Sequence, residues 1–314
     1  MSFSMSPSHK FLIVLLGPTG VGKTELSLSI AKHFDAPIIS SDSRQFFREM
    51  RIGTAYPSDE ELANAKHYLV GHKSITERYS CGMFEMEAIE LLNEIYQTHN
   101  LSLLVGGSGL YIDALLNGID DFPTPDPELR KSLHEQLRNE GVESLRQQLK
   151  ILDPEYYAKV DLKNPQRILK AVEVCLQTGK TYTSFLTRPK KPRPFTAIKV
   201  GLNRPREELY RRINERVDKM IEQGLVDEVR NLIPYRNLNA LNTVGYKEIF
   251  QYLDGEISLP QAVELIKRNT RRYAKRQLTW WGRDNEITWF HPNQKDEIIQ
   301  YIEQQVKEKS NGKT

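Results

Sequence analysis

The 314-residue sequence contains only two cysteines, Cys81 and Cys175, and it lacks a long apolar run. The cysteines lie far apart with no partner pattern, which excludes a disulfide framework and a cysteine metal site and indicates buried thiols in a reducing compartment. Without a run of about 18 apolar residues, no transmembrane helix is expected. The first ten residues lack the apolar segment of a signal peptide. We therefore expect a cytoplasmic protein with no membrane contact.

Neither sign of charge dominates the chain, whose formal net charge is +3, but the charge is unevenly distributed. Residues 187–314 carry 25 Lys and Arg against 17 Asp and Glu, whereas residues 1–186 carry 19 against 24. A positive C-terminal part on a nearly neutral chain favours a polyanionic partner for one face. An ordinary solvated surface explains the same counts, so charge alone leaves both interpretations open.

Residues 17–24 form a complete G-x-x-x-x-G-K-[ST] phosphate loop. An apolar run at 11–16 precedes it and apolar residues at helical spacing follow it, which is the strand–turn–helix context that this motif requires. Backbone N–H groups of such a loop bind phosphates. The candidate ligand-binding residues are Gly17, Pro18, Thr19, Gly20, Val21, Gly22, Lys23 and Thr24. We expect Lys23 to reach the terminal phosphates and the Thr24 hydroxyl to hold Mg²⁺, but the motif does not identify the molecule that carries the phosphates.

Apolar strands alternate with helical patterns from residue 11 to about residue 116, and the strand pattern returns at 197–202. This alternation predicts an α/β fold, a phosphate-loop NTPase-like parallel sheet flanked by helices. Between two proline-rich segments, residues 125–186 show helical spacing alone, and we expect an all-helical insertion domain there. The core then comprises residues 1–124 and 187–314. The proline-rich exit at 188–194 is expected to be an extended linker, with a nucleic-acid-binding arm as the alternative.

Asp42 follows the strand at 36–40, where open α/β sheets bind their ligands, so it should face the phosphate loop. It fits a general base, or a group that binds Mg²⁺ through water; a turn-forming aspartate is the structural alternative. Glycine-rich residues 106–109 follow the next strand and favour a second wall of the site. The helix at 260–281 is strongly basic and ends in two tryptophans, which suits phosphate contacts as well as a solvated amphipathic helix.

Six motifs in order resemble the tRNA dimethylallyltransferase (tRNA isopentenyltransferase) family, from about residue 12 to residue 290. They are the phosphate loop, Asp42-Ser43-Arg44-Gln45, Gly106-Gly107-Ser108-Gly109-Leu110-Tyr111, Pro165-Gln166-Arg167, Val244-Gly245-Tyr246 and the run from Thr270 to Trp280. The resemblance implies transfer of a dimethylallyl group from its diphosphate to N6 of the adenosine 3′-adjacent to the anticodon in tRNA, with Mg²⁺ as cofactor. The implied partners are the anticodon stem-loop of tRNA and dimethylallyl diphosphate. Separately from the resemblance, we expect a monomer.

The resemblance also assigns roles to residues. Asp42 corresponds to the general base, and Lys23, Thr24 and Arg216 complete the catalytic set, with arginines 211 and 212 as competitors of Arg216. The positions that correspond to tRNA contacts are Asp42, Ser43, Arg44, Gln45, Ser108, Arg130, Gln166, Arg167, Ile168, Leu169 and Lys170. To these we add Arg271 and Lys275 of the basic helix.

Three alternatives remain. A phosphate-loop kinase of a small metabolite explains residues 1–120 equally well but leaves the insertion and the basic helix unexplained. An isopentenyltransferase of free adenine nucleotides conflicts with the tRNA-type motifs after residue 160. A non-enzymatic RNA adaptor does not account for Asp42 opposite an intact phosphate loop. The tRNA species, the metal preference and the movement of the insertion are not encoded in recognisable motifs.

Overall fold

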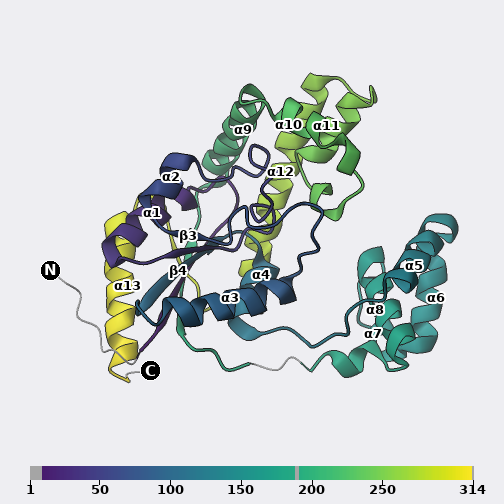
Figure 1. Ribbon diagram of the computed structural model, residues 1–314, viewed down its shortest axis with the longest axis horizontal. Coiled ribbons are helices and arrows are strands. Elements are labelled where there is room, and N and C mark those ends of the chain that lie inside the picture. The colour runs from purple at the N-terminus through teal and green to yellow at the C-terminus, as the bar shows by residue number, and fades with distance from the viewer. Residues whose placement is uncertain (1–8, 188–190, 313–314) are drawn as a thin grey trace. The chain divides into compact units, whose positions relative to one another are not determined.

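The computed structural model describes residues 9–187 and 191–312, which divide into two compact units. The core unit consists of the chain up to Leu116 and from Pro192 onward, and the helical lobe consists of Asn117–Lys191 (Figure 1). Residues 188–190 of the expected extended linker lie outside the described residues.

The core unit is built on a six-stranded sheet in the order β3-β2-β4-β1-β5-β6, in which every neighbouring pair is parallel. Its strands are β1 (Phe11–Leu16), β2 (Ile38–Ser40), β3 (His67–Tyr68), β4 (Leu101–Gly106), β5 (Thr196–Leu202) and β6 (Thr288–Phe290). Because the strands are parallel, their carboxyl ends meet at one edge of the sheet. The predicted α/β fold is confirmed; the short strand β3 is an addition that the sequence did not predict.

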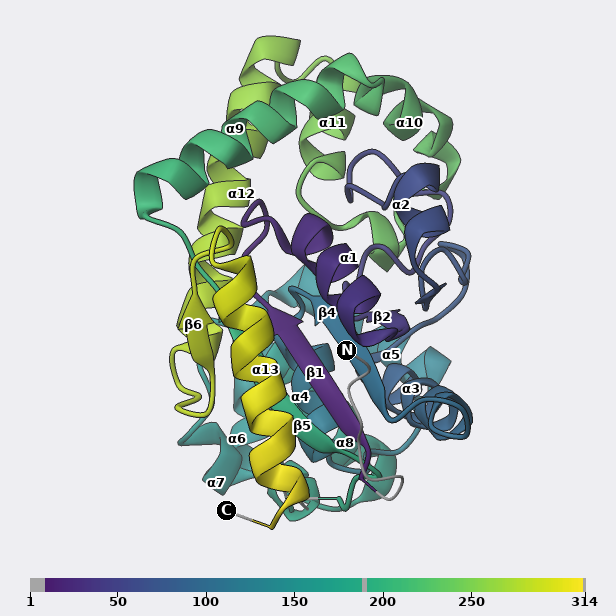
Figure 2. The ribbon, with the colours of Figure 1, turned by 90° about the vertical axis from the view of Figure 1, so that its left-hand side faces the viewer.

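Strand β1 is buried on both faces, and its side chains alternate between two apolar clusters. Phe11, Ile13 and Leu15 pack in a cluster that includes residues of α1 (Lys23–Phe34), α9 (Arg206–Glu222) and α13 (Lys295–Ser310). The residues between them pack with α3 (Cys81–Ile95) and α4 (Gly109–Asn117) on the other face. Figure 2 shows α13 crossing in front of β1 and β5. This period of two explains why the strand reads as a continuous apolar run.

A third apolar cluster lies among the helices that follow β5. These helices are α9, α10 (Leu225–Asn231), α11 (Tyr246–Leu253) and α12 (Leu259–Trp281), with short 3₁₀ turns at Ile233–Tyr235 and Asn239–Leu241. The small helix α2 (Asp59–Asn64) lies between β2 and β3 in the chain and carries a capping box formed by Ser58 and Glu61. The cluster anchors α9 and α12, which both contribute side chains to the cavity described below.

The helical lobe has an apolar core of its own, formed by residues between Leu129 and Tyr182. Its helices are α5 (Pro127–Glu140), α6 (Val142–Leu152), α7 (Pro154–Tyr157) and α8 (Pro165–Thr178), followed by a 3₁₀ turn at Tyr182–Phe185. Asp126 and Asn164 cap α5 and α8 through their side chains, and each helix has proline at its first position. These caps satisfy backbone N–H groups at the start of each helix and so stabilise helices that have only a small apolar core to pack against.

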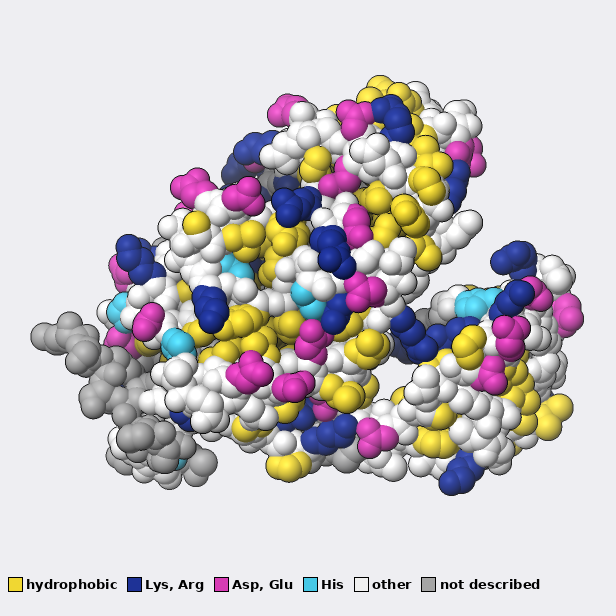
Figure 3. Space-filling view, viewed as in Figure 1, with side chains coloured by type: hydrophobic (Ala, Val, Ile, Leu, Met, Phe, Trp, Pro, Cys, Tyr) yellow, Lys and Arg dark blue, Asp and Glu magenta, His cyan; other side chains and the backbone are white. Residues whose placement is uncertain are grey.

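The surface shows mixed charge, and no described helix is both long and apolar enough to cross a membrane. On the face of the core unit seen in Figure 3, Lys and Arg side chains are scattered among Asp and Glu. The positive excess of the C-terminal part therefore does not form a single patch on this face.

Candidate active site

The phosphate loop joins the carboxyl end of β1 to the first residue of α1. Gly22 caps α1 with a left-handed backbone (φ 107°), a conformation that favours glycine over residues with a side chain. At Gly17 a Cβ atom would lie 2.7 Å from the carbonyl oxygen of Leu202, so only glycine allows β5 to approach this closely. These two glycines let the loop turn tightly and expose the N-terminus of α1.

The Lys23 side chain folds back onto the phosphate loop. Its Nζ donates hydrogen bonds to the carbonyl oxygens of Gly17 (2.7 Å) and Pro18 (3.0 Å). Burial lowers the pKa of Lys23 to about 8; the charge of Asp42 opposes this shift, and that of Arg216 adds to it. An anion bound beside Lys23 would favour the charged ammonium and so would raise this lowered pKa again.

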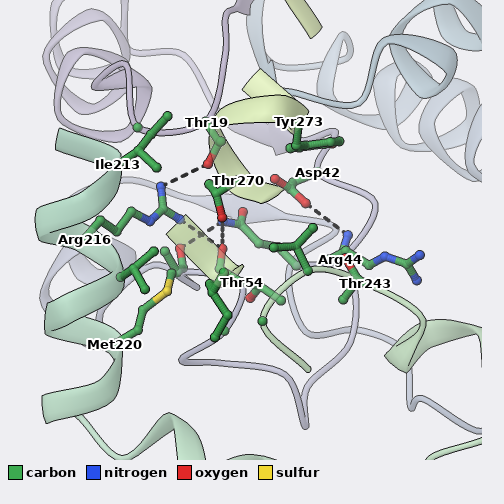
Figure 4. A pocket seen from close by; sticks show the side chains of 18 of the residues that line it. Thr19, Asp42, Arg44, Thr54, Ile213, Arg216, Met220, Thr243, Thr270 and Tyr273 are labelled. Atoms are coloured by element: carbon green, nitrogen blue, oxygen red, sulfur yellow. Dashed lines mark hydrogen bonds between the residues drawn. The ribbon is translucent and has the colours of Figure 1, made fainter. Parts of the chain in front are cut away.

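The loop opens onto a cavity of about 880 Å³ that lies entirely within the core unit (Figure 4). Segments from both halves of the chain line it: the phosphate loop, residues 42–45, residues 53–55, helix α9, residues 242–248 and helix α12. One part of the wall is apolar, with Ile213, Val217, Met220, Val244 and Ile266. The cavity therefore combines a phosphate-binding end with an apolar wall.

Asp42 lines this cavity directly beyond β2. Its Oδ1 accepts a hydrogen bond from the backbone N–H of Arg44 at 3.0 Å, which fixes the side chain in an Asx-type turn. Figure 4 shows the carboxylate beside Tyr273, whose pKa is raised to about 12 by burial. Within the described chain, Oδ2 accepts no hydrogen bond. The turn-forming role and a chemical role are thus compatible, because each uses a different oxygen.

Of the three competing arginines of α9, Arg216 and Arg212 line the cavity, and Figure 4 shows Arg216 pointing toward Thr19. Its guanidinium lies 3.5 Å from Thr19 Oγ1 and 3.4 Å from the carbonyl oxygen of Thr54, and burial lowers its pKa. Arg212 also lines the cavity and donates from Nε to the carbonyl oxygen of Gly20 at 3.0 Å. Arg211 is absent from the cavity wall and points to solvent beside Glu215. The geometry therefore favours Arg216 over Arg211.

The residues of the Asp42–Gln45 motif do more than face the cavity; they hold its walls together. Arg44 donates to the carbonyl oxygens of Asn239 and Ala240, at 3.1 and 2.9 Å. Gln45 donates to those of Thr54 and Ala55, at 3.2 and 2.9 Å. These bonds join residues 54–55 and residues 239–240, two segments that are far from each other in sequence, to the end of β2.

Ser108 lies behind the wall and is absent from its surface. It is 8% exposed; its hydroxyl accepts a hydrogen bond from Ser43 N at 2.9 Å and donates one to Ser43 Oγ at 3.0 Å. The structure thus gives Ser108 a supporting position beneath the 42–45 turn.

The basic helix α12 presents its arginines to different surroundings. Arg272 and Arg276 line the cavity together with Tyr273. Arg271 instead donates to Asn214 Oδ1 at 2.7 Å, and Lys275 is exposed and absent from the wall. The structure therefore does not bring Arg271 and Lys275 to the cavity, because a helix turns successive residues about 100° apart.

Sequence reasoning missed Gln277, which is 6% exposed and crosslinks two loops of the site. Its Oε1 accepts the backbone N–H of Thr19 at 2.9 Å, and its Nε2 donates to the carbonyl oxygen of Gly107 at 2.7 Å. Its position directly after the basic run that ends at Arg276 was the available signal, but its role depends on contacts 170 and 258 residues away.

In the helical lobe, the expected nucleic-acid contacts separate into exposed and buried residues. Gln166 and Arg167 are exposed at the first turn of α8. Ile168 and Leu169 are 0% and 2% exposed and belong to the lobe's apolar core, so their side chains do not reach the surface of the lobe, and contact of this stretch with RNA stays a prediction. Helical periodicity explains this burial, since four consecutive residues cannot all face outward. Arg130 and Lys170 share one buried partner, Glu173.

The described residues contain no group of three or more His, Cys, Asp and Glu side chains that could hold a metal by themselves. Thr24 and Asp42 nevertheless line the same cavity. Mg²⁺ commonly takes one or two protein oxygens and completes its shell with phosphates and water. The donor set thus fits a Mg²⁺ ion that arrives with a phosphate ligand.

Known proteins resemble the chain over most of its length. Residues 45–284 match the family model described as IPP transferase. The tRNA dimethylallyltransferase 1 of Bacteroides thetaiotaomicron is 55% identical over 291 residues, 93% of this chain and 94% of that protein. The tRNA dimethylallyltransferase 1 of Bacteroides fragilis is 54% identical over 298 residues, 95% of this chain and 99% of that protein.

Solved structures agree in fold. The full-length tRNA isopentenylpyrophosphate transferase from Bacillus halodurans superposes with a TM-score of 0.72 at 36% identity, covering 96% of this chain and 98% of that one. A eukaryotic dimethylallyltransferase acting on tRNA superposes with a TM-score of 0.76 at 26% identity, covering 90% of this chain and 74% of that one. The similarity includes both the core unit and the lobe, because it extends over nearly the whole chain.

Proposed function

The chain belongs to the tRNA dimethylallyltransferase family, and we propose that its core-unit cavity is where the dimethylallyl group passes from donor to tRNA. The enzyme transfers this group from dimethylallyl diphosphate to N6 of the adenosine 3′-adjacent to the anticodon, and diphosphate leaves. One observation carries the proposed site: Lys23, Asp42 and Arg216 converge on the cavity at the end of the phosphate loop.

The donor diphosphate binds at the phosphate loop. The residues that hold it are Thr19 to Thr24, with Gly17 and Pro18 forming the entry of the loop. Lys23 and Arg216 neutralise its charge, and the apolar wall around Val217 and Met220 accommodates the five-carbon tail. Electrostatic stabilisation matters most at the leaving group, because charge accumulates on the diphosphate as its bond to the allylic carbon breaks.

Mg²⁺ would bind together with the diphosphate, and Thr24, which lines the cavity, would hold it on the protein side. When bound, it supplies further neutralisation of the leaving group. Thr24 is the direct protein ligand in this proposal, as the last residue of the phosphate loop.

Asp42 is the general base. The lone pair of adenine N6 is delocalised into the ring, so N6 attacks the allylic carbon efficiently only if it loses a proton to Asp42 as the new bond forms. Proton transfer to a positioned base contributes about 10²–10⁴-fold. Oδ2 is the oxygen that takes the proton, since Oδ1 is held by the N–H of Arg44.

The anticodon arm of tRNA contacts both units. At the core unit we propose Ser43, Arg44 and Gln45 beside the target base, with Ser108 supporting them. On α12, Arg272 and Arg276 are the main phosphate contacts, because they line the cavity, and Arg271 and Lys275 contribute less. In the lobe we propose Arg130, Gln166, Arg167 and Lys170. These contacts offset the few kcal/mol that unstacking the adenosine costs.

A direct assay tests the function. The protein is incubated with radiolabelled dimethylallyl diphosphate or with ATP, each paired with tRNA or AMP. Label should enter tRNA from dimethylallyl diphosphate, and ATP should not be consumed. Steady ATP hydrolysis would instead support the kinase, and label in AMP would support the nucleotide prenyltransferase. We further propose that the enzyme is a cytoplasmic monomer, which sedimentation of the purified protein with and without tRNA checks.

A further inference from the structure

The carbonyl oxygens of the phosphate loop are held by one cation of the loop itself and by two arginines from distant parts of the chain. Lys23 takes those of Gly17 and Pro18, and Arg212 takes that of Gly20. The carbonyl oxygen of Val21 accepts a hydrogen bond from Nε of Arg204 at 2.7 Å. Arg204 lies two residues beyond β5, whose carboxyl end meets that of β1 at the same edge of the sheet.

The contact between Arg204 and Val21 fixes the orientation of the Val21–Gly22 peptide. In a trans peptide, the C=O and the following N–H point in opposite directions. Holding the Val21 carbonyl on the outside therefore turns the N–H of Gly22 toward the opposite side, and Gly22 lines the cavity. Because glycine has no Cβ, the backbone at Gly22 (φ 107°) has more conformational freedom than at other residues, and an external contact helps to fix the direction of this peptide.

Arg204 is itself firmly fixed. Its side chain is 8% exposed, and Nη1 pairs with Glu208 Oε1 while Nε holds Val21. The other oxygen of Glu208 lies 3.3 Å from Nε2 of His291, which follows β6. A planar guanidinium makes both contacts at once in a fixed geometry, which an ammonium group cannot reproduce.

Arg204 and Arg212 both hold a carbonyl oxygen of the phosphate loop, but they lie differently relative to the cavity. Arg212 lines the cavity, whereas Arg204 is absent from the cavity wall. We propose that Arg204 is a positioning residue that acts through the Val21–Gly22 peptide, aiming the Gly22 N–H at the donor diphosphate. This inference rests on the proposed donor site. It predicts that the geometry of the Arg204 fork matters, beyond its charge.

The test compares Arg204→Lys and Arg204→Gln with wild type. Steady-state rates are measured against dimethylallyl diphosphate, and the affinity for inorganic pyrophosphate is measured by calorimetry. Both variants should lose about 10–100-fold in kcat/KM for the donor, with tRNA affinity unchanged, because a misaimed backbone donor stabilises the leaving group poorly. Arg211→Gln is the matched control: it removes an exposed arginine of α9 outside the cavity and should behave like wild type.

Two results would overturn the inference. Full activity of Arg204→Lys would mean that positive charge alone suffices, and full activity of both variants would mean that the contact is structural. If Arg204→Gln fails to fold, Glu208→Gln tests the same fork from its other end and should lower kcat/KM in the same direction by a smaller factor. Lys23→Ala distinguishes a misplaced donor site from a failure of the role proposed for Arg204. If Lys23→Ala binds pyrophosphate like wild type, the donor site is misplaced; if it loses affinity while the Arg204 variants do not, only the role of Arg204 fails.

Discussion

Arg130 and Glu173 form a two-point ion pair in the helical lobe, with Nε–Oε1 at 2.6 Å and Nη2–Oε2 at 2.8 Å. The Glu173 side chain is fully buried, whereas that of Arg130 is 36% exposed. Lys170 approaches the same carboxylate at 3.2 Å. One buried anion thus fixes two cations that we propose as tRNA contacts, which makes it a determinant of their positions.

The first prediction concerns the effect of the Glu173 charge on tRNA binding. Glu173→Gln removes a negative charge beside the proposed RNA site, so simple attraction predicts tighter tRNA binding. We expect the opposite, a weakening of about 3–10-fold, because Arg130 and Lys170 lose their fixed positions. Filter binding at fixed salt measures the effect. Glu135→Gln, an exposed residue of α5, gives the same charge change without the pair and should not weaken binding. Tighter binding by Glu173→Gln would contradict the positioning role.

The second prediction concerns Asp42. Asp42→Asn keeps an acceptor for the N–H of Arg44 and so preserves the turn, but it cannot take a proton from N6. We expect kcat to fall by about 10²–10⁴-fold with tRNA affinity close to wild type. Asp42→Ala also loses the turn and should be at least as slow. Single-turnover kinetics and tRNA binding measure both. Loss of donor binding with intact chemistry would identify Asp42 as a metal-site residue instead.

The third prediction follows from the lowered pKa of Lys23, about 8. Above this pH the free enzyme loses the ammonium charge that attracts the diphosphate, so donor affinity should fall as pH rises through 8. The decline should approach about tenfold per pH unit once Lys23 is mostly neutral. Lys23→Arg keeps its charge, so this part of the pH dependence should disappear in that variant. Competition of dimethylallyl diphosphate with a labelled donor between pH 6.5 and about 9.5 provides the measurement, and parallel pH profiles for both proteins would refute the assignment.

The fourth prediction distinguishes two faces of α12. Arg272 and Arg276 line the cavity, whereas Arg271 is tied to Asn214 and Lys275 points elsewhere. Each phosphate contact that is lost lowers the log–log salt slope of tRNA binding by about 0.7–0.9. The pair Arg272→Gln/Arg276→Gln should therefore flatten the slope more than the charge-matched pair Arg271→Gln/Lys275→Gln. Equal slopes for the two pairs would show that facing the cavity does not decide which arginines contact RNA.

The sequence predicted those parts of the fold and site that depend on local patterns. The phosphate loop, the parallel sheet and the position of Asp42 after β2 follow from apolar runs and glycine spacing within a few residues. A motif does not show which of its side chains are buried: helical periodicity places Ile168 and Leu169 in the lobe's apolar core, whereas Gln166 and Arg167 are exposed.

Long-range contacts explain what sequence reasoning could not find. Gln277 meets Thr19 across 258 residues, and Arg204 meets Val21 across 183. No local pattern marks a side chain whose partner is a backbone atom on another strand's loop. Such residues become visible only once the sheet has brought the ends of β1, β4 and β5 together.

The last prediction concerns the helical lobe as a whole. Its two ends meet, since the N–H of Lys191 donates to the carbonyl oxygen of Asn117 at 3.2 Å. A Gly/Ser linker of about four residues can therefore replace residues 118–190 without stretching the core unit. The three apolar clusters of the core unit contain no residue of the lobe, so the deletion variant should fold.

In this variant the donor site remains complete, because the phosphate loop, Asp42 and Arg216 all belong to the core unit. Pyrophosphate affinity should stay within about twofold of wild type, while tRNA affinity should fall at least tenfold through loss of several phosphate contacts. Calorimetry and filter binding on the same preparation provide both constants, with thermal unfolding as the check on folding. Full tRNA affinity would mean that Gln166 and Arg167 do not contact RNA and that the lobe serves another purpose. A parallel loss of pyrophosphate binding would mean instead that the lobe supports the donor site, since removing RNA contacts alone leaves the phosphate loop unchanged.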